Sequence, residues 1–177
     1  PVSQSAKDDC ATKPALTRQI WLNDNAQPLW YHPGTGGGGF LREVWSDISG
    51  SSILSLTSNS DYPDNPTISA VITTSLEGTQ DFADNYGERL RGYLHPPVTG
   101  AYRFWLSGDD SAQLLLSTDA DPLHATPILT LTTSTGYRDF DAQVLSIQRS
   151  AEIQLVAGQE YYIEVLHKED TDSDSVS

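Results

Sequence analysis

Residues 86–106 read YGERLRGYLHPPVTGAYRFWL, and this stretch decides the fold. Apolar and polar side chains alternate over Arg89–His95 and again over Ala101–Leu106, the period of two that is typical of β-strands with one buried face. Pro96-Pro97 ends the first segment, and Thr99-Gly100 provides a turn before the second. We therefore expect two strands joined as a hairpin.

Similar short segments follow in the rest of the chain. Further strand candidates are 113–117, 128–133, 151–155 and 161–167. In the second strand of the expected hairpin, Tyr102, Phe104 and Leu106 share one face and Arg103 and Trp105 share the other. Gly, Pro and Asp separate the segments, and helix signals are nearly absent. The pattern predicts an all-β protein, an antiparallel sandwich or barrel.

Residues 1–39 have little of the apolar periodicity seen in the rest of the chain. They end in the glycine-rich run Gly34–Gly39, and Phe40-Leu41-Arg42 follows where a phosphate-binding loop would need Gly-Lys-Ser/Thr. We interpret 1–39 as an extension or linker that adds a strand at most, with candidates at 18–22 and 29–31. Residues 40–177 are expected to form the domain. Cys10 is the only cysteine and has no partner for a disulfide bond.

Composition restricts the class of partner. The chain has 177 residues, with 24 acidic and 10 basic side chains and a formal net charge of −14. Such a charge repels phosphate backbones and anionic lipid, so we expect no nucleic-acid binding. No apolar run approaches the ~20 residues of a membrane span, so we expect no membrane insertion. Neutral ligands, cationic ligands and metal ions remain.

Catalytic patterns are absent from the sequence. There is no Gly-x-Ser-x-Gly nucleophile motif, and no pair of acidic residues stands out by an apolar setting. The four histidines, at 32, 95, 124 and 167, lack the spacing of a zinc site. We expect a protein that is not an enzyme.

Three landmarks identify a family. Gly-Tyr-Leu at 92–94, Thr-Gly-x-Tyr at 99–102 and Ala-Gly-x-x-Tyr-Tyr at 157–162 occur in one order, and GDDSAQLLLSTDADP follows the second at 108–122. Together they resemble the PA-fourteen domain, named after the fourteen-kilodalton segment of a toxin protective antigen and common in bacterial and yeast adhesins. The likeness runs from Phe40 to the end of the sequence. It implies a twisted β-sandwich whose loops at one end form a ligand site.

The resemblance also implies a metal site. In sugar-binding members, two adjacent aspartates at the position of Asp109 and Asp110 are joined by a cis peptide bond and ligate one calcium ion. Two vicinal hydroxyls of a sugar then complete the shell of 6–8 oxygens that calcium takes. The alternative for this pair is an ordinary turn, in which each carboxylate bonds its own backbone.

A second loop supplies the other calcium ligands in those relatives. Asp174 falls on the family's Asp, but Ser175 stands where Asn is usual, and acidic and hydroxyl residues replace the usual glycines. The ligands expected here are Asp172, Asp174, Ser175 and Ser177, the serines through nearby main-chain carbonyls. A solvated acidic tail is the alternative interpretation of 170–177.

Two aromatic residues are candidates for sugar stacking, Trp105 and Tyr137, because an aromatic face suits the apolar C–H patches of a sugar ring. The alternatives are that Trp105 packs between sheets and that Tyr137 is an ordinary loop aromatic. Neither alternative is excluded by the sequence.

The sequence thus predicts a calcium-dependent lectin module of an extracellular or cell-surface adhesin. Its expected partners are glycans on cells or matrix with fucose-, mannose- or glucose-type vicinal diols. The module would be a monomeric part of a larger chain, with adhesion strengthened by avidity. The alternative is a non-catalytic spacer or docking module of a large secreted protein, or an accessory module of a glycoside hydrolase.

Overall fold

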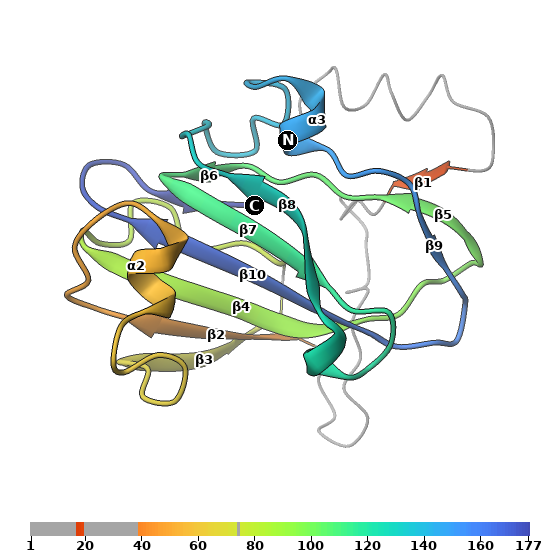
Figure 1. Cartoon of the computed structure of the whole chain (residues 1–177), viewed down its shortest axis with the longest axis horizontal. Helices are drawn as coiled ribbons and strands as arrows, with labels where there is room; N and C mark the ends of the chain where they lie inside the picture. The colour runs from red at the N-terminus through yellow and green to blue at the C-terminus, as the bar shows by residue number, and fades with distance from the viewer. Residues whose placement is uncertain (1–16, 20–38, 74) are drawn as a thin grey trace.

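A computed structural model describes residues 17–19, 39–73 and 75–177 and arranges their strands in three sheets (Figure 1). The largest sheet has the strand order β3-β2-β4-β10-β7-β8, a second has the order β1-β5-β9, and a two-stranded ribbon pairs β11 with β6. The strands are β1 (Thr17–Gln19), β2 (Phe40–Trp45), β3 (Ile68–Ile72), β4 (Tyr86–Leu94), β5 (Gly100–Arg103), β6 (Gly108–Asp109), β7 (Ser111–Leu116), β8 (Thr126–Leu131), β9 (Ile153–Leu155), β10 (Tyr161–Glu169) and β11 (Ser175–Val176). The helices are short: α2 (Ile53–Thr57), α3 (Leu145–Gln148) and the 3₁₀ turn η1 (Pro122–His124).

The six-stranded sheet is antiparallel throughout and is centred on β4 and β10. Val165 of β10 lies opposite Leu90 of β4 on one side and Leu114 of β7 on the other. All three side chains are buried, which is the outcome of the period-two pattern. The predicted all-β sandwich is confirmed, and each strand segment predicted between 89 and 167 has a counterpart.

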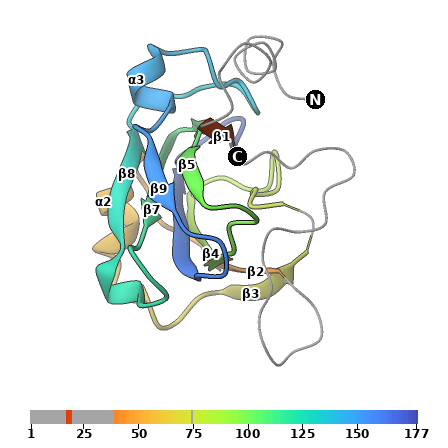
Figure 2. The same ribbon diagram turned by 90° about the vertical axis from the view of Figure 1, so that its right-hand side faces the viewer.

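The main core lies between the two larger sheets. It joins residues of the six-stranded sheet to Tyr102 on β5, to Leu155 on β9 and to Phe104 and Leu106 just beyond β5. Figure 2 shows β1, β5 and β9 together as a layer beside β4, β7 and β8. Tyr102, Phe104 and Leu106 are buried, as their shared face predicts.

The predicted hairpin of the segments 89–95 and 101–106 is wrong. β4 pairs with β2 and β10, whereas β5 crosses to the other sheet and pairs with β9, with Gly100 opposite Leu155. Pro96 and Pro97 lack amide donors, so the chain leaves the first sheet there and cannot fold back onto β4. The first predicted turn is therefore a corner between layers.

The outer face of the large sheet is covered at one end by α2. Leu56 of this helix packs with Trp45, Ile48 and Leu166 in a second buried cluster. Leu56 lies against Gly87, opposite Lys168 at one end of β4 and β10, and the candidate site lies at that end.

Of residues 1–39, the structure describes only Gly39 and β1, which runs parallel to β5 with Thr17 opposite Ala101. β1 overlaps the strand candidate at 18–22. The candidate at 29–31 and Cys10 lie outside the described residues. Within the described segments, no helix is long and apolar enough to span a membrane.

Candidate functional site

The two adjacent aspartates lie on the β6–β11 ribbon at one end of the sandwich. Asp109 and Asp110 are half-buried and joined by a cis peptide bond. Asp109 lies opposite Ser175 of β11, so the turn at 109–110 and the loop 170–177 are brought together. Thr135 braces the turn from the other side, since Gly108 N donates to its Oγ1 (2.8 Å) and Thr135 N donates to the Gly108 carbonyl (2.8 Å).

Asp110 and Asp170 connect the loops around this turn. The amide of Asp170 donates to Asp110 Oδ2 (3.0 Å), and Ser134 Oγ lies 3.5 Å from Asp110 Oδ1. Asp170 Oδ1 in turn accepts from the amide of Gly50 (2.8 Å). Two segments distant in sequence thus contact the carboxylate of Asp110, and Asp170 joins a third, at Gly50, to them.

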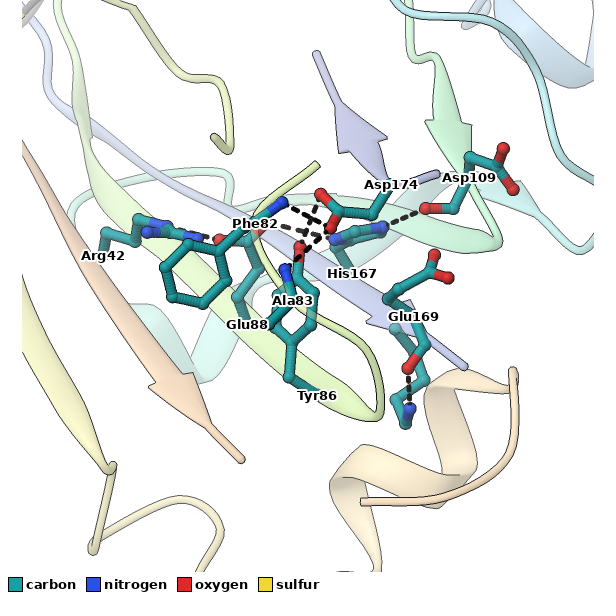
Figure 3. A network of polar contacts seen from close by, with 10 residues as sticks. Arg42, Phe82, Ala83, Tyr86, Glu88, Asp109, His167, Glu169 and Asp174 are labelled. Carbon is teal, nitrogen blue, oxygen red and sulfur yellow. Dashed lines mark hydrogen bonds and ion pairs between the residues drawn. The ribbon is translucent and has the colours of Figure 1, made fainter. Parts of the chain in front are cut away.

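Glu169 is the unusual group of the site. Its side chain is 0% exposed, and within the described part of the chain neither Oε1 nor Oε2 has a hydrogen-bond partner. Burial, with the negative charges of Asp110, Asp109 and Asp174, raises the pKa of Glu169 to about 8. Figure 3 shows this carboxylate directed toward Asp109. A buried carboxylate without a partner is costly, and a bound cation is one way to compensate it.

The neighbouring lysine does not provide that compensation. Lys168 is buried, and its Nζ donates to the main-chain carbonyl of Glu169. Its side chain leaves β10 on the opposite face from that of Glu169, because successive residues of a strand alternate. Burial lowers the pKa of Lys168, although the carboxylates of Asp170, Glu169 and Asp110 act against this.

Asp174 has a structural task that the sequence did not reveal. Its Oδ2 accepts from the amides of Phe82 (2.7 Å) and Ala83 (3.1 Å), and its Oδ1 accepts from the Tyr86 hydroxyl (3.0 Å). The side chain is buried, so it joins the loop before β4 to the loop before β11 (Figure 3). Its role as a calcium ligand stays a prediction.

The remaining loop residues predicted as ligands are placed differently. Asp172 is exposed, and Ser175 is buried in β11. Ser177 exchanges main-chain hydrogen bonds with Ser107 (2.8 and 3.0 Å). A solvated tail is therefore the wrong interpretation of 174–177, since this segment packs on the domain. The ligand roles of these residues stay predictions.

The ion pair of Glu77 and Arg138 fixes the side chain of Tyr137. Its hydroxyl donates to Glu77 Oε2 (3.1 Å), and Arg138 binds both oxygens of Glu77 (2.8 Å each) with its guanidinium 5.1 Å from the Tyr137 ring centre. The ring is 36% exposed and lies two residues after Thr135, which braces the aspartate turn. Trp105 is half-buried and forms a backbone bridge with Arg149. Stacking of a sugar on either ring stays a prediction.

In the described part of the chain, side chains alone do not complete a metal site. Among the described residues, no group of three or more His, Cys, Asp or Glu side chains is already placed to hold a metal ion. A cation at Asp109 and Asp110 would therefore need main-chain or ligand oxygens besides carboxylates. The two unpartnered oxygens of Glu169 are the observation that favours such a cation.

Sequence analysis missed Glu169 and His167 as site residues, although a signal was present. Ile163 and Val165 are buried positions of β10. His167 and Glu169 lie two and four residues after Val165, so their side chains point to the same face of the strand. Charged or titratable residues at inward positions of a central strand are exceptional and mark a polar site within the fold.

Comparison with solved structures shows the same fold. The epithelial adhesin 9 A domain of Candida glabrata, solved in complex with Galb1-4GlcNAc, aligns with a TM-score of 0.56 and 12% identity over 84% of either chain. The epithelial adhesin 6 A domain of the same yeast, solved in complex with Galb1-3GlcNAc, aligns with a TM-score of 0.52 and 14% identity over 81% of this chain and 79% of that one.

Two mouse proteins are similar in sequence. N-acetyl-beta-glucosaminyl-glycoprotein 4-beta-N-acetylgalactosaminyltransferase 1 is 29% identical over 135 residues, which are 72% of this chain and 12% of that protein. Fibrocystin-L is 35% identical over 91 residues, which are 50% of this chain and 2% of that protein. The chain thus spans only a small part of the relatives it matches.

The model of the PA14 domain, the PA-fourteen domain of the sequence analysis, matches residues 55–176. The chain belongs to the PA14 domain family.

Proposed function

We propose that the chain is a calcium-dependent carbohydrate-binding module in which Asp109 and Asp110 hold the ion. The observation that carries the proposal is the buried, unpartnered carboxylate of Glu169 beside this aspartate pair. The negative charges of Asp110 and Asp109 act on this buried carboxylate, and a divalent cation held by the aspartate pair would offset both the repulsion and the burial without a partner.

The chemistry of the donors fits a hard cation. Calcium accepts carboxylate, carbonyl and hydroxyl oxygens, and this end of the sandwich offers all three kinds. Asp109 and Asp110 would hold the ion, with main-chain oxygens of 170–177 as further donors. Bound calcium would supply open positions for two vicinal hydroxyls of a sugar. A neutral diol also suits a chain with a net charge of −14, which repels anionic ligands.

The relatives support a binding role for the module. The adhesin domains that share its fold were solved with galactose-containing disaccharides, and those domains are similar in size to this chain. We therefore infer a non-catalytic module outside the cell that attaches a larger protein to glycans.

The test is a calcium titration of the wild type and of two variants. Asp110→Asn removes one charge and keeps an acceptor for the Asp170 amide, so the loop contact at 3.0 Å survives. Asp121→Asn is the matched control, because Asp121 is exposed and caps η1 with an oxygen that Asn also has. We expect Asp110→Asn to weaken calcium binding at least tenfold and to abolish calcium-dependent sugar binding. Equal calcium affinity in the two variants would contradict the proposal.

A further inference from the structure

A buried chain of charged groups lies directly beneath the aspartate turn. His167 Nε2 lies 2.5 Å from the main-chain carbonyl of Asp109, and Nδ1 lies 3.0 Å from Glu88 Oε1 (Figure 3). On the far side, Arg42 Nε donates to Glu88 Oε2 (2.5 Å). His167 and Glu88 are 0% exposed and Arg42 is buried, so the pair of His167 and Glu88 is shielded from water.

The geometry fixes the charge of His167. A carbonyl oxygen and an ionised carboxylate only accept hydrogen bonds, so both ring nitrogens must carry a proton. Arg42 keeps Glu88 ionised, which excludes the arrangement in which a neutral glutamic acid donates to Nδ1. The pKa values agree with this, because the bond to Glu88 outweighs burial and raises the pKa of His167, while His167 and Arg42 outweigh burial and lower that of Glu88. The ring is therefore an imidazolium that donates twice.

The atom that the imidazolium binds belongs to the peptide group between the two aspartates. With the Asp109 carbonyl directed inward to His167, the Asp109 side chain points away from the ring, as Figure 3 shows. The same ring is packed edge-on by Tyr86, whose hydroxyl binds Asp174 (ring centres 5.7 Å apart, 77°). One buried network thus fixes the aspartate turn and the loop 170–177 relative to each other.

We propose that His167, held by Glu88 and Arg42, is the positioning residue of the calcium site, which it serves by holding the Asp109 carbonyl inward and thereby orienting the turn that carries both aspartates. This inference rests on the proposed function. It predicts a change in calcium affinity that is opposite in sign to the change expected from electrostatic repulsion alone. A positive charge near a cation site weakens cation binding, so removing it without loss of geometry would tighten binding. If the positioning role of His167 dominates, removing the charged ring weakens calcium binding.

The test compares calcium affinity in His167→Gln, Glu88→Gln and the wild type, with His124→Gln as the control. His124 is an exposed histidine paired with Asp119, whose carbonyl binds Tyr162 at the opposite end of β10. We expect the calcium Kd to rise at least tenfold in His167→Gln and Glu88→Gln and to stay within twofold in His124→Gln. Circular dichroism and the unfolding temperature without calcium establish that each variant is folded at the assay temperature.

An unchanged or lower calcium Kd in folded His167→Gln would overturn the positioning role. A wild type that binds no calcium would instead refute the proposed function, so the two failures are distinguishable. Should both variants fail to fold, nitrogen-15 NMR of the wild type at neutral pH decides the matter. A slowly exchanging ring N–H signal of His167 that is coupled to the Asp109 carbonyl carbon is expected. The absence of that coupled signal would overturn the inference.

Discussion

The unpartnered Glu169 carboxylate should make the calcium-free domain lose stability as the pH rises. In the folded chain its pKa is raised to about 8 from an ordinary value of 4.5, so between these values the folded state holds a proton that the unfolded state has released. Stability then falls with pH by up to ~1.4 kcal/mol per pH unit. From pH 5 to pH 8 the loss through this group is about 3 kcal/mol, a large share of a typical stability of ~5–15 kcal/mol.

Glu169→Gln isolates this group, because the amide does not titrate. The raised pKa of the buried His167 gives a loss of the same sign, since its stabilising charge disappears as the pH rises, but that loss is common to both proteins and cancels in the comparison. Urea unfolding in chelator at pH 5 and pH 8 is the assay. We expect the wild type to lose about 3 kcal/mol more than Glu169→Gln over this interval.

Calcium should change that result. A cation at the site stabilises the ionised carboxylate, so in excess calcium the extra loss of the wild type should shrink toward zero. Equal losses of the two proteins in chelator would refute the assignment of an unpartnered, proton-holding carboxylate. An extra loss that calcium leaves unchanged would refute the placement of the ion beside Glu169.

Other predictions test the supports of the site and the core. Asp174→Ala leaves three donors of the loop before β4 without their acceptor, and should lower the free energy of unfolding in urea by about 2–4 kcal/mol. Gly78→Ala would place a Cβ 2.3 Å from Glu88 Oε1, so it should lower the free energy of unfolding by about 1–3 kcal/mol in the same assay and weaken calcium binding. An unchanged calcium Kd would contradict a role of Glu88 in supporting the site. Leu90→Ala should cost about 2–5 kcal/mol because the side chain is fully buried in the main core, whereas Leu123→Ala, which is 89% exposed, should cost less than about 0.5 kcal/mol; similar effects would contradict the assigned core.

Local patterning predicted the strands but not how they are shared between sheets. The local pattern places 161–167 on a strand wherever its neighbours lie, and this segment falls within β10. Whether Gly100–Arg103 folds back on β4 or crosses to β9 depends on pairing partners more than 50 residues away, with Ala101 opposite Gln154. Pro96-Pro97 marks the end of β4, but the sequence around it does not indicate the partner strand at 153–155, so the hairpin prediction was wrong.

The candidate site was predicted in part for a similar reason. The adjacent aspartates are visible in the sequence, and the resemblance gave them a role. The sequence does not distinguish Asp174, whose carboxylate accepts from three protein donors, from Glu169, whose carboxylate oxygens have no hydrogen-bond donor among the described residues. That difference depends on which amides the loop 79–85 presents, and only the folded structure brings this loop beside β11.

The most direct test of the central claim is a glycan array probed with this domain, once in millimolar calcium and once in excess chelator. We predict binding to a set of glycans that share one vicinal-diol geometry, present in calcium and lost in chelator. Binding that survives the chelator, or an array without signal in either condition, would contradict a calcium-dependent sugar site at Asp109 and Asp110.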